Sequence, residues 1–190
     1  MPSKRIVHVV FERQALLEPW TGAIEVLAAA AAEVWGPIKF AMVHDYSQRL
    51  VQEWPILDDS LADVLARCTG LGPTELLFLY PHDRAEGSVS VHLQRRSLVV
   101  SVSRLSTAVA ARDTLIVRLW KSVAGYRPLV VLEGEELEID GDTVVDSPPS
   151  ITIYPQIDLC DRAIIRREST TSSEIDGGTL IEVERVPRSS

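Results

Sequence analysis

The chain lacks most of the short patterns that mark a reactive or membrane-bound protein. Its two cysteines, Cys68 and Cys160, do not form the CxxC spacing of a redox or zinc site, which favours reduced, buried thiols. Its most apolar stretch, residues 23–35, is interrupted by glutamates and is shorter than the roughly 20 residues that a membrane-spanning helix needs. We therefore expect a cytoplasmic protein that does not enter the membrane.

Phosphate-binding patterns are missing as well. Arg13, Gln14 and Ala15 follow the first predicted strand, where a dinucleotide-binding protein would have GxGxxG, and no segment matches the P-loop pattern. Basic residues are in deficit, since 19 Lys and Arg face 27 Asp and Glu and the net charge is −8. Such a charge opposes binding to a phosphate backbone. We expect no cofactor and no nucleic acid partner, whereas a basic protein would be attracted.

What the chain does contain is an ordinary globular composition. Hydrophobic residues make up 46% and charged residues 24% of the 190 residues, which is enough to form one buried core. No internal repeat, glycine-serine linker or sharp change of composition divides the chain. The sequence therefore predicts a single globular domain over residues 1–190.

The N-terminal part of the chain predicts a βαβ unit. Residues 5–12 are β-branched and almost continuously apolar, as in a strand that is covered on both faces. Residues 19–35 place apolar side chains at helical intervals and end at Gly36, which is typical of a helix. A second apolar run, residues 38–43, comes next. A helix between two such strands indicates a right-handed crossover between parallel neighbours.

The rest of the chain predicts further helices and strands. We expect a helix over residues 58–68, a strand over 75–80, a hairpin from 89–93 and 98–103, a helix over 106–124 and a strand over 128–133. Residues 46–57 and 169–173 show no regular alternation and are predicted to be irregular. The C-terminal portion, residues 134–186, is predicted to be rich in strands. The fold class is therefore α/β to α+β, with a mixed β-sheet, about three main helices, and antiparallel hairpins after the βαβ unit.

Two His-Asp pairs are the most suggestive chemical feature of the sequence. His44 and Asp45 follow one predicted strand, and His82 and Asp83 follow another. If those strands are parallel neighbours, both pairs lie at the carboxyl edge of the sheet, where open α/β folds bind their ligands. Imidazole and carboxylate can together ligate a divalent metal that activates water. The alternative reading is that each Asp simply stabilises a turn at a strand end.

An acidic segment and one tryptophan offer a candidate binding surface instead. Trp54 lies in the irregular stretch, where it could serve as an exposed anchor or pack beneath a loop. The segment that follows the strand over 128–133 is predicted to form an exposed hairpin, and its acidic residues are Glu133, Glu135, Glu136, Glu138, Asp140 and Asp142. Such a patch would steer a basic partner toward the protein. A third surface is the polar side of the predicted hairpin, which carries Ser88, Ser90 and His92.

These features leave three functional hypotheses and favour binding over catalysis. The first is a non-catalytic acidic protein that acts through protein–protein contacts, as bacterial immunity proteins and antitoxins of this size and charge do. The second is a small metal-assisted hydrolase that uses the His-Asp pairs. The third is a structural subunit of a larger assembly, such as a homo-oligomer formed through a free sheet edge.

Overall fold

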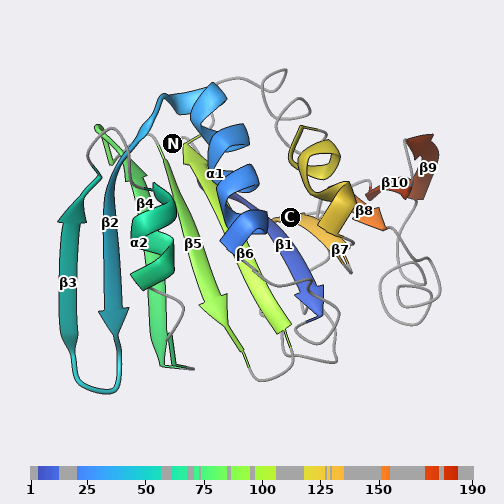
Figure 1. The fold of residues 1–190 in the computed structure, drawn as a ribbon. Helices are drawn as coiled ribbons and strands as arrows, with labels where there is room; N and C mark the ends of the chain where they lie inside the picture. The colour runs from blue at the N-terminus through green and yellow to red at the C-terminus, as the bar shows by residue number, and fades with distance from the viewer. Residues whose placement is uncertain are drawn as a thin grey trace, which may run out of the picture.

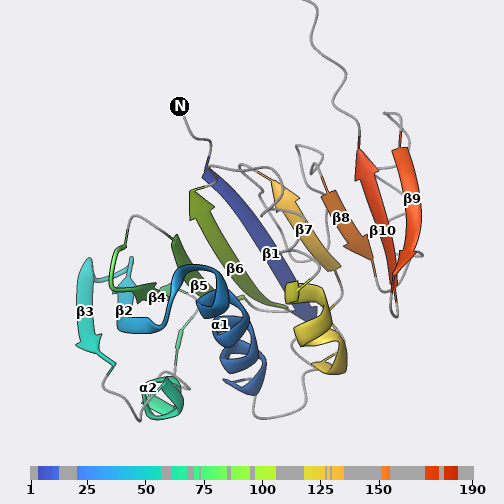
Figure 2. The ribbon, with the colours of Figure 1, turned by 90° about the horizontal axis from the view of Figure 1, so that it is seen from above.

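The fold, seen in a computed structural model, is one long sheet with helices on a single face (Figures 1 and 2). The structure describes residues 4–12, 21–56, 61–67, 71–72, 74–84, 87–94, 97–105, 118–126, 128, 130–134, 151–154, 170–175 and 178–183. Within them the strands are β1 (Lys4–Glu12), β2 (Ile38–Asp45), β3 (Leu50–Pro55), β4 (Glu75–Pro81), β5 (Gly87–Leu93), β6 (Ser97–Leu105), β7 (Val130–Gly134), β8 (Ile151–Tyr154), β9 (Thr170–Ile175) and β10 (Gly178–Val183). The helical segments are α1 (Thr21–Trp35), α2 (Leu61–Arg67) and residues 118–123, which lead into the 3-10 turn η2 (Ala124–Tyr126).

The sheet joins all ten described strands in the order β3-β2-β4-β5-β6-β1-β7-β8-β10-β9. Every described pairing between neighbouring strands is antiparallel. The α+β class, helices α1 and α2 and the N-terminal strand-helix-strand connection are as the sequence predicts. Of the helix predicted over residues 106–124, residues 118–123 are helical and residues 106–117 lie outside the described residues. The difference lies in the crossover: β1 and β2 run in the same direction, but β4, β5 and β6 lie between them. The sheet therefore gains its length from hairpins and contains no parallel pair among the described strands.

Two strands lie where the sequence predicts irregular chain. β3 falls within residues 46–57, and β9 falls within the polar tract that begins at residue 169. They are the first and last strands of the sheet order, so each has only one described neighbour. An edge strand buries few side chains, and its sequence need not alternate between apolar and polar residues. The hydrophobic pattern on which the prediction depended is therefore weak in these strands.

Helix α1 forms and ends for local reasons before it packs on the sheet. It is rich in alanine, the residue with the highest helix propensity, and its buried residues include Ile24, Leu27 and Ala31, as the sequence pattern predicts. Gly36 ends it with a φ of 95°, a left-handed conformation that favours glycine, and the Gly36 N–H donates to the Ala32 carbonyl at 2.8 Å. The helix lies across β5 and β6 on the helix-bearing face (Figure 1).

The core lies between the helices and the sheet. Figure 2 shows α1, α2 and the helical residues 118–123 on the same side of the strands. The β-strand side chains that point to this side are buried, for example Val7 and Phe11 in β1, Leu77 in β4 and Val100 in β6. No described helix is long and apolar enough to cross a membrane.

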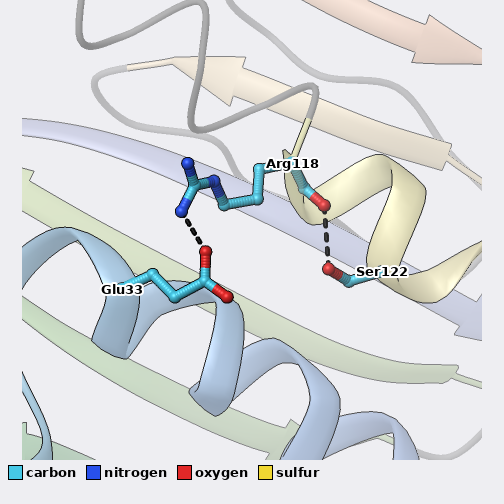
Figure 3. A network of polar contacts seen from close by, with 3 residues as sticks. All are labelled: Glu33, Arg118 and Ser122. Carbon is cyan, nitrogen blue, oxygen red and sulfur yellow. Dashed lines mark hydrogen bonds and ion pairs between the residues drawn. The ribbon is translucent and has the colours of Figure 1, made fainter.

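A polar contact on the outer side of the helix layer links two of these elements. Arg118, at the start of the described residues 118–123, forms an ion pair with Glu33 of α1, and the Ser122 hydroxyl donates to the Arg118 carbonyl at 2.9 Å (Figure 3). The Glu33 side chain is 64% exposed, so water screens the pair. The ion pair is therefore expected to add little to the stability of the fold.

Candidate binding surface on the sheet

The described helices leave the opposite face of the sheet uncovered over β2, β4 and β5. Because side chains alternate along a strand, every second residue of these strands points to this side. All of them are half-buried, in contrast to the fully buried residues that alternate with them. We call this surface the open face; its members are Phe40, Met42, His44, Leu76, Phe78, Tyr80, Ser88, Ser90 and His92.

Aromatic rings gather on the open face around one arginine. Arg84 follows β4, and its guanidinium carbon lies 5.2 Å from the centroid of the Phe40 ring and 5.4 Å from that of Tyr80. The Tyr80 ring is stacked at 6.0 Å from Phe78. Both arginine contacts are within the range of a cation–π interaction. Aromatic residues and arginine are the types enriched at the centres of protein–protein interfaces, so this cluster is the best candidate contact surface.

The electrostatics of the cluster are set by an ion pair between Arg84 and Glu53. Glu53 lies on β3, and its carboxylate accepts from the Arg84 guanidinium across β2. The side chains are 45% and 40% exposed, which leaves both accessible to a partner. Burial raises the pKa of the Tyr80 hydroxyl, and the positive charge of Arg84 acts in the opposite direction. Tyr80 is therefore a neutral hydrogen-bonding group at physiological pH.

On the same side of the sheet, most side chains of β6 and β1 are more deeply buried than those of the open face. His8 is only 8% exposed, and its Nδ1 lies 2.7 Å from the Ser101 hydroxyl. The Ser88 and Ser103 hydroxyls are hydrogen-bonded at 2.7 Å on the neighbouring strands. His8 Nε2 is buried and has no hydrogen-bond partner, and burial lowers the pKa of His8 to about 4. His8 is therefore a neutral, structural histidine rather than a charged contact residue.

The two His-Asp pairs do not come together. Their strands, β2 and β4, are neighbours, but they are antiparallel, so Asp45 lies opposite Glu75 while Ile38 lies opposite Pro81. His82 follows the end of β4 that lies opposite Ile38, whereas His44 lies near the other end of β2. From the rise per residue of a strand, these two ends are about 20 Å apart. No metal site with bonds of about 2 Å can include both pairs. In the described residues no group of three His, Cys, Asp or Glu side chains could hold a metal ion.

Asp45 instead stabilises a turn at the end of its strand, which is the alternative interpretation of the His-Asp pairs. Its Oδ1 accepts from the Ser47 N–H at 2.8 Å and hydroxyl at 2.7 Å, and from the Gln48 N–H and Thr74 hydroxyl at 3.3 Å. These hydrogen bonds, with that of the Ser47 hydroxyl the strongest, lower the pKa of the Asp45 carboxyl. The carboxylate therefore closes the β2–β3 turn. His44 is on the open face and lies 4.1 Å from Tyr46, ring centroid to centroid.

The other predicted contact residues are only partly described. Trp54 of β3 is not a free anchor, because it lies opposite Ala41 on the helix-bearing side and packs against the hydrophobic core. Glu133 is in β7, opposite Val7 of β1. The rest of the acidic hairpin lies outside the described residues: Glu135, Glu136, Glu138, Asp140 and Asp142. The Arg84 cluster was not predicted from sequence, because its members come from β2, β3 and the end of β4 and become neighbours only in the folded sheet.

Comparison with known proteins finds a similar fold among solved structures. The fold and surface define the chain as an α+β protein with one helix-covered face and one face on which half-buried aromatic residues gather. No protein-family model matches the sequence, and no curated protein matches it. Among solved structures it resembles the Pseudomonas aeruginosa T6SS protein PA0821, with a TM-score of 0.55 and 7% sequence identity over 95% of this chain. The chain spans 66% of that structure's length. At this identity the similarity shows the fold alone.

Proposed function

We propose that the protein is a non-catalytic binding protein of the general type of a bacterial immunity protein or antitoxin. The observation that carries the proposal is the open face, where Phe40, Phe78 and Tyr80 are half-buried around the exposed Arg84. Rigid aromatic rings on a sheet lose little conformational entropy when they are covered, and they supply large contact areas. An arginine held over two of them offers a fixed hydrogen-bonding group for a carboxylate or carbonyl of a partner.

Charge and the structural similarity support the same proposal. The net charge of −8 favours association with a protein that carries a basic surface. The acidic residues from 133 to 142 would add steering in the cytoplasm, where we place the protein, while the open face would supply most of the binding energy. The solved structure with the same fold is named a T6SS protein, which is compatible with a role in secretion or in immunity to a secreted protein.

The test is a quantitative pull-down from the native host, followed by purification of the retained protein and a titration. Three baits are compared: the wild type, Phe78→Ala on the open face, and Ala29→Lys on the exposed surface of α1 as the matched control. The wild type and A29K should retain the same partner in a defined stoichiometry. F78A should weaken the purified complex by 10-fold or more, since a central aromatic residue contributes more than about 1.4 kcal/mol.

Two results would count against the proposal. One is that the wild type retains nothing that A29K and an unrelated acidic bait do not also retain. The other is a partner whose affinity is unchanged in F78A and in a Tyr80→Ala variant, because that partner would not use the open face. Circular dichroism of each variant checks that the sheet is intact, so a loss of binding is not a loss of folding.

A further inference from the structure

The exposed hydrophobic residues of the described chain are concentrated at one corner of the sheet. Tyr46, Leu50 and Val51 are 55%, 45% and 51% exposed, and they are the large hydrophobic residues found exposed in the part of the chain that the structure describes. All belong to the hairpin between β2 and β3. β3 is the first strand of the sheet order, so it pairs with β2 on one side and with no described strand on the other. Figure 1 shows β3 at the edge of the sheet. This corner therefore combines an edge that no described strand covers with exposed apolar side chains.

The backbone geometry shows which groups of β3 face outward. The Ile56 N–H donates to the Lys39 carbonyl of β2 at 2.7 Å, so residue 56 points its backbone toward the sheet. Backbone groups alternate in direction along a strand, and Pro55, which has no N–H, therefore occupies an outward position. By the same alternation, the N–H and C=O groups of Val51 and Glu53 point away from β2. These groups form a short ladder that another strand could extend.

We infer that a second copy of this chain pairs with that ladder, β3 against β3 in antiparallel register about a two-fold axis at Val51. This register places the exposed Val51 side chains of the two copies opposite each other. Two residues away on either side, it places Glu53 of one copy opposite Arg49 of the other. Opposite charges on directly facing residues stabilise an antiparallel pair, and hydrophobic β-branched residues do so as well. The strand is thus complementary to itself in both charge and hydrophobicity.

The local structure is compatible with this pairing. Arg49 is the exposed turn residue just before the strand, and its φ of 54° shows that its backbone does not continue the extended strand, so it can meet Glu53 of the other copy only through its long side chain. Glu53 uses Oε1 to bind Arg84, and a carboxylate has the capacity to accept from a second guanidinium. The other end of the sheet, β9, has the sequence TTSSEI, in which Ile175 is the one large apolar residue. A β3–β3 contact is therefore favoured over a contact of β3 with β9.

The pairing is expected to be weak and to depend on concentration. A single pair of short edge strands buries less than about 1,000 Å², which is the range of weak, transient interfaces, so we expect a dissociation constant of roughly 10 μM to 1 mM. The inference does not depend on the proposed function, because it rests on the backbone edge of β3 and shares only Glu53 with the Arg84 cluster. Its failure would therefore leave the open-face hypothesis standing.

Sedimentation equilibrium of the purified full chain, over loading concentrations that span roughly 10 μM to 1 mM, tests the inference. The wild type should shift from monomer to dimer. Val51→Lys should weaken the dimer by about tenfold or more, because like charges then face each other across the axis. The matched control is A29K, which adds the same charge on α1 and should leave the dissociation constant within about twofold.

A charge exchange tests the register. Glu53→Arg should abolish the dimer, since two arginines then face each other, whereas the double variant R49E/E53R restores opposite charges and should restore it. Val51→Pro removes one outward N–H, leaves the bonds to β2 intact, and should also give a monomer. A wild type that stays monomeric over the whole concentration range overturns the inference. So does a dimer that V51K and V51P leave unchanged, or that the double variant fails to restore.

Discussion

Mild acid should destabilise this fold through His8. The side chain is 8% exposed, Nδ1 bonds to the Ser101 hydroxyl, and Nε2 has no partner. Placing a positive charge there would remove it from water without a compensating carboxylate among the contacts described. Burial accordingly lowers the pKa of His8 from 6.5 to about 4. His8 is therefore protonated at a lower pH in the folded chain than in the unfolded chain.

The direction and size of the effect follow from proton linkage. Between pH 6.5 and about 4 the unfolded state binds more protons at His8 than the folded state, so the free energy of unfolding falls as the pH falls. The loss is about 2 kcal/mol at pH 5 and about 3 kcal/mol at pH 4. Asp45 acts in the same direction but at lower pH, since its pKa is lowered from an ordinary value of 3.8. The stability that depends on His8 is thus lost at a higher pH than the stability that depends on Asp45.

Urea denaturation at a series of pH values between 7 and 5 measures this loss. His8→Gln should remove about 2 kcal/mol of the pH dependence, because glutamine does not titrate. Ser101→Ala should keep the wild-type slope, because burial rather than the hydrogen bond shifts the pKa of His8. An H8Q variant that loses as much stability as the wild type between pH 7 and 5 would refute the reasoning.

Three further substitutions probe local contacts, each by the urea midpoint. Gly87→Ala should cost about 1–3 kcal/mol, since the added methyl group would collide with the ring of Trp35, whereas Ala at the exposed Gly125 meets nothing within 4 Å. Asp45→Ala should lower the midpoint by leaving the turn donors unbonded, and Asp45→Asn should recover part of the loss. Glu33→Gln should change stability by less than about 0.5 kcal/mol, because its pair with Arg118 is exposed; a larger loss would show that this pair holds the helices together.

The sequence predicted the interior of the fold better than its margins. The strands that carry continuous or alternating apolar residues, such as β1, β4 and β5, lie where the pattern placed them. β3 and β9 were missed, because a strand at the rim of a sheet packs on one neighbour and its exposed positions tolerate any residue. β3 has five exposed residues out of six, so no buried set existed to be recognised.

A group of surface residues could be predicted from the sequence when its members lie on one strand, but not when they lie on several strands. Alternation within one strand correctly placed Ser88, Ser90 and His92 on a common face. The His-Asp hypothesis required the relative direction of two strands, which local sequence does not contain; antiparallel pairing sent the two pairs to opposite ends. The Arg84 cluster required strand order, because Glu53 and Arg84 are 31 residues apart and lie on either side of β2.

The position of β1 has a consequence for how the chain is assembled during synthesis. β1 leaves the ribosome before the other described strands, yet both of its neighbours, β6 and β7, come much later in the chain. Its contact from His8 to Ser101 spans 93 residues. The hairpins β2–β3, β4–β5 and β5–β6 can form from nearby segments, whereas β1 gains its first neighbour only when β6 has been made and its second only with β7. Until residue 134 is made, β1 lacks one of its two described neighbours, and an unpaired hydrophobic strand edge in a nascent chain favours aggregation.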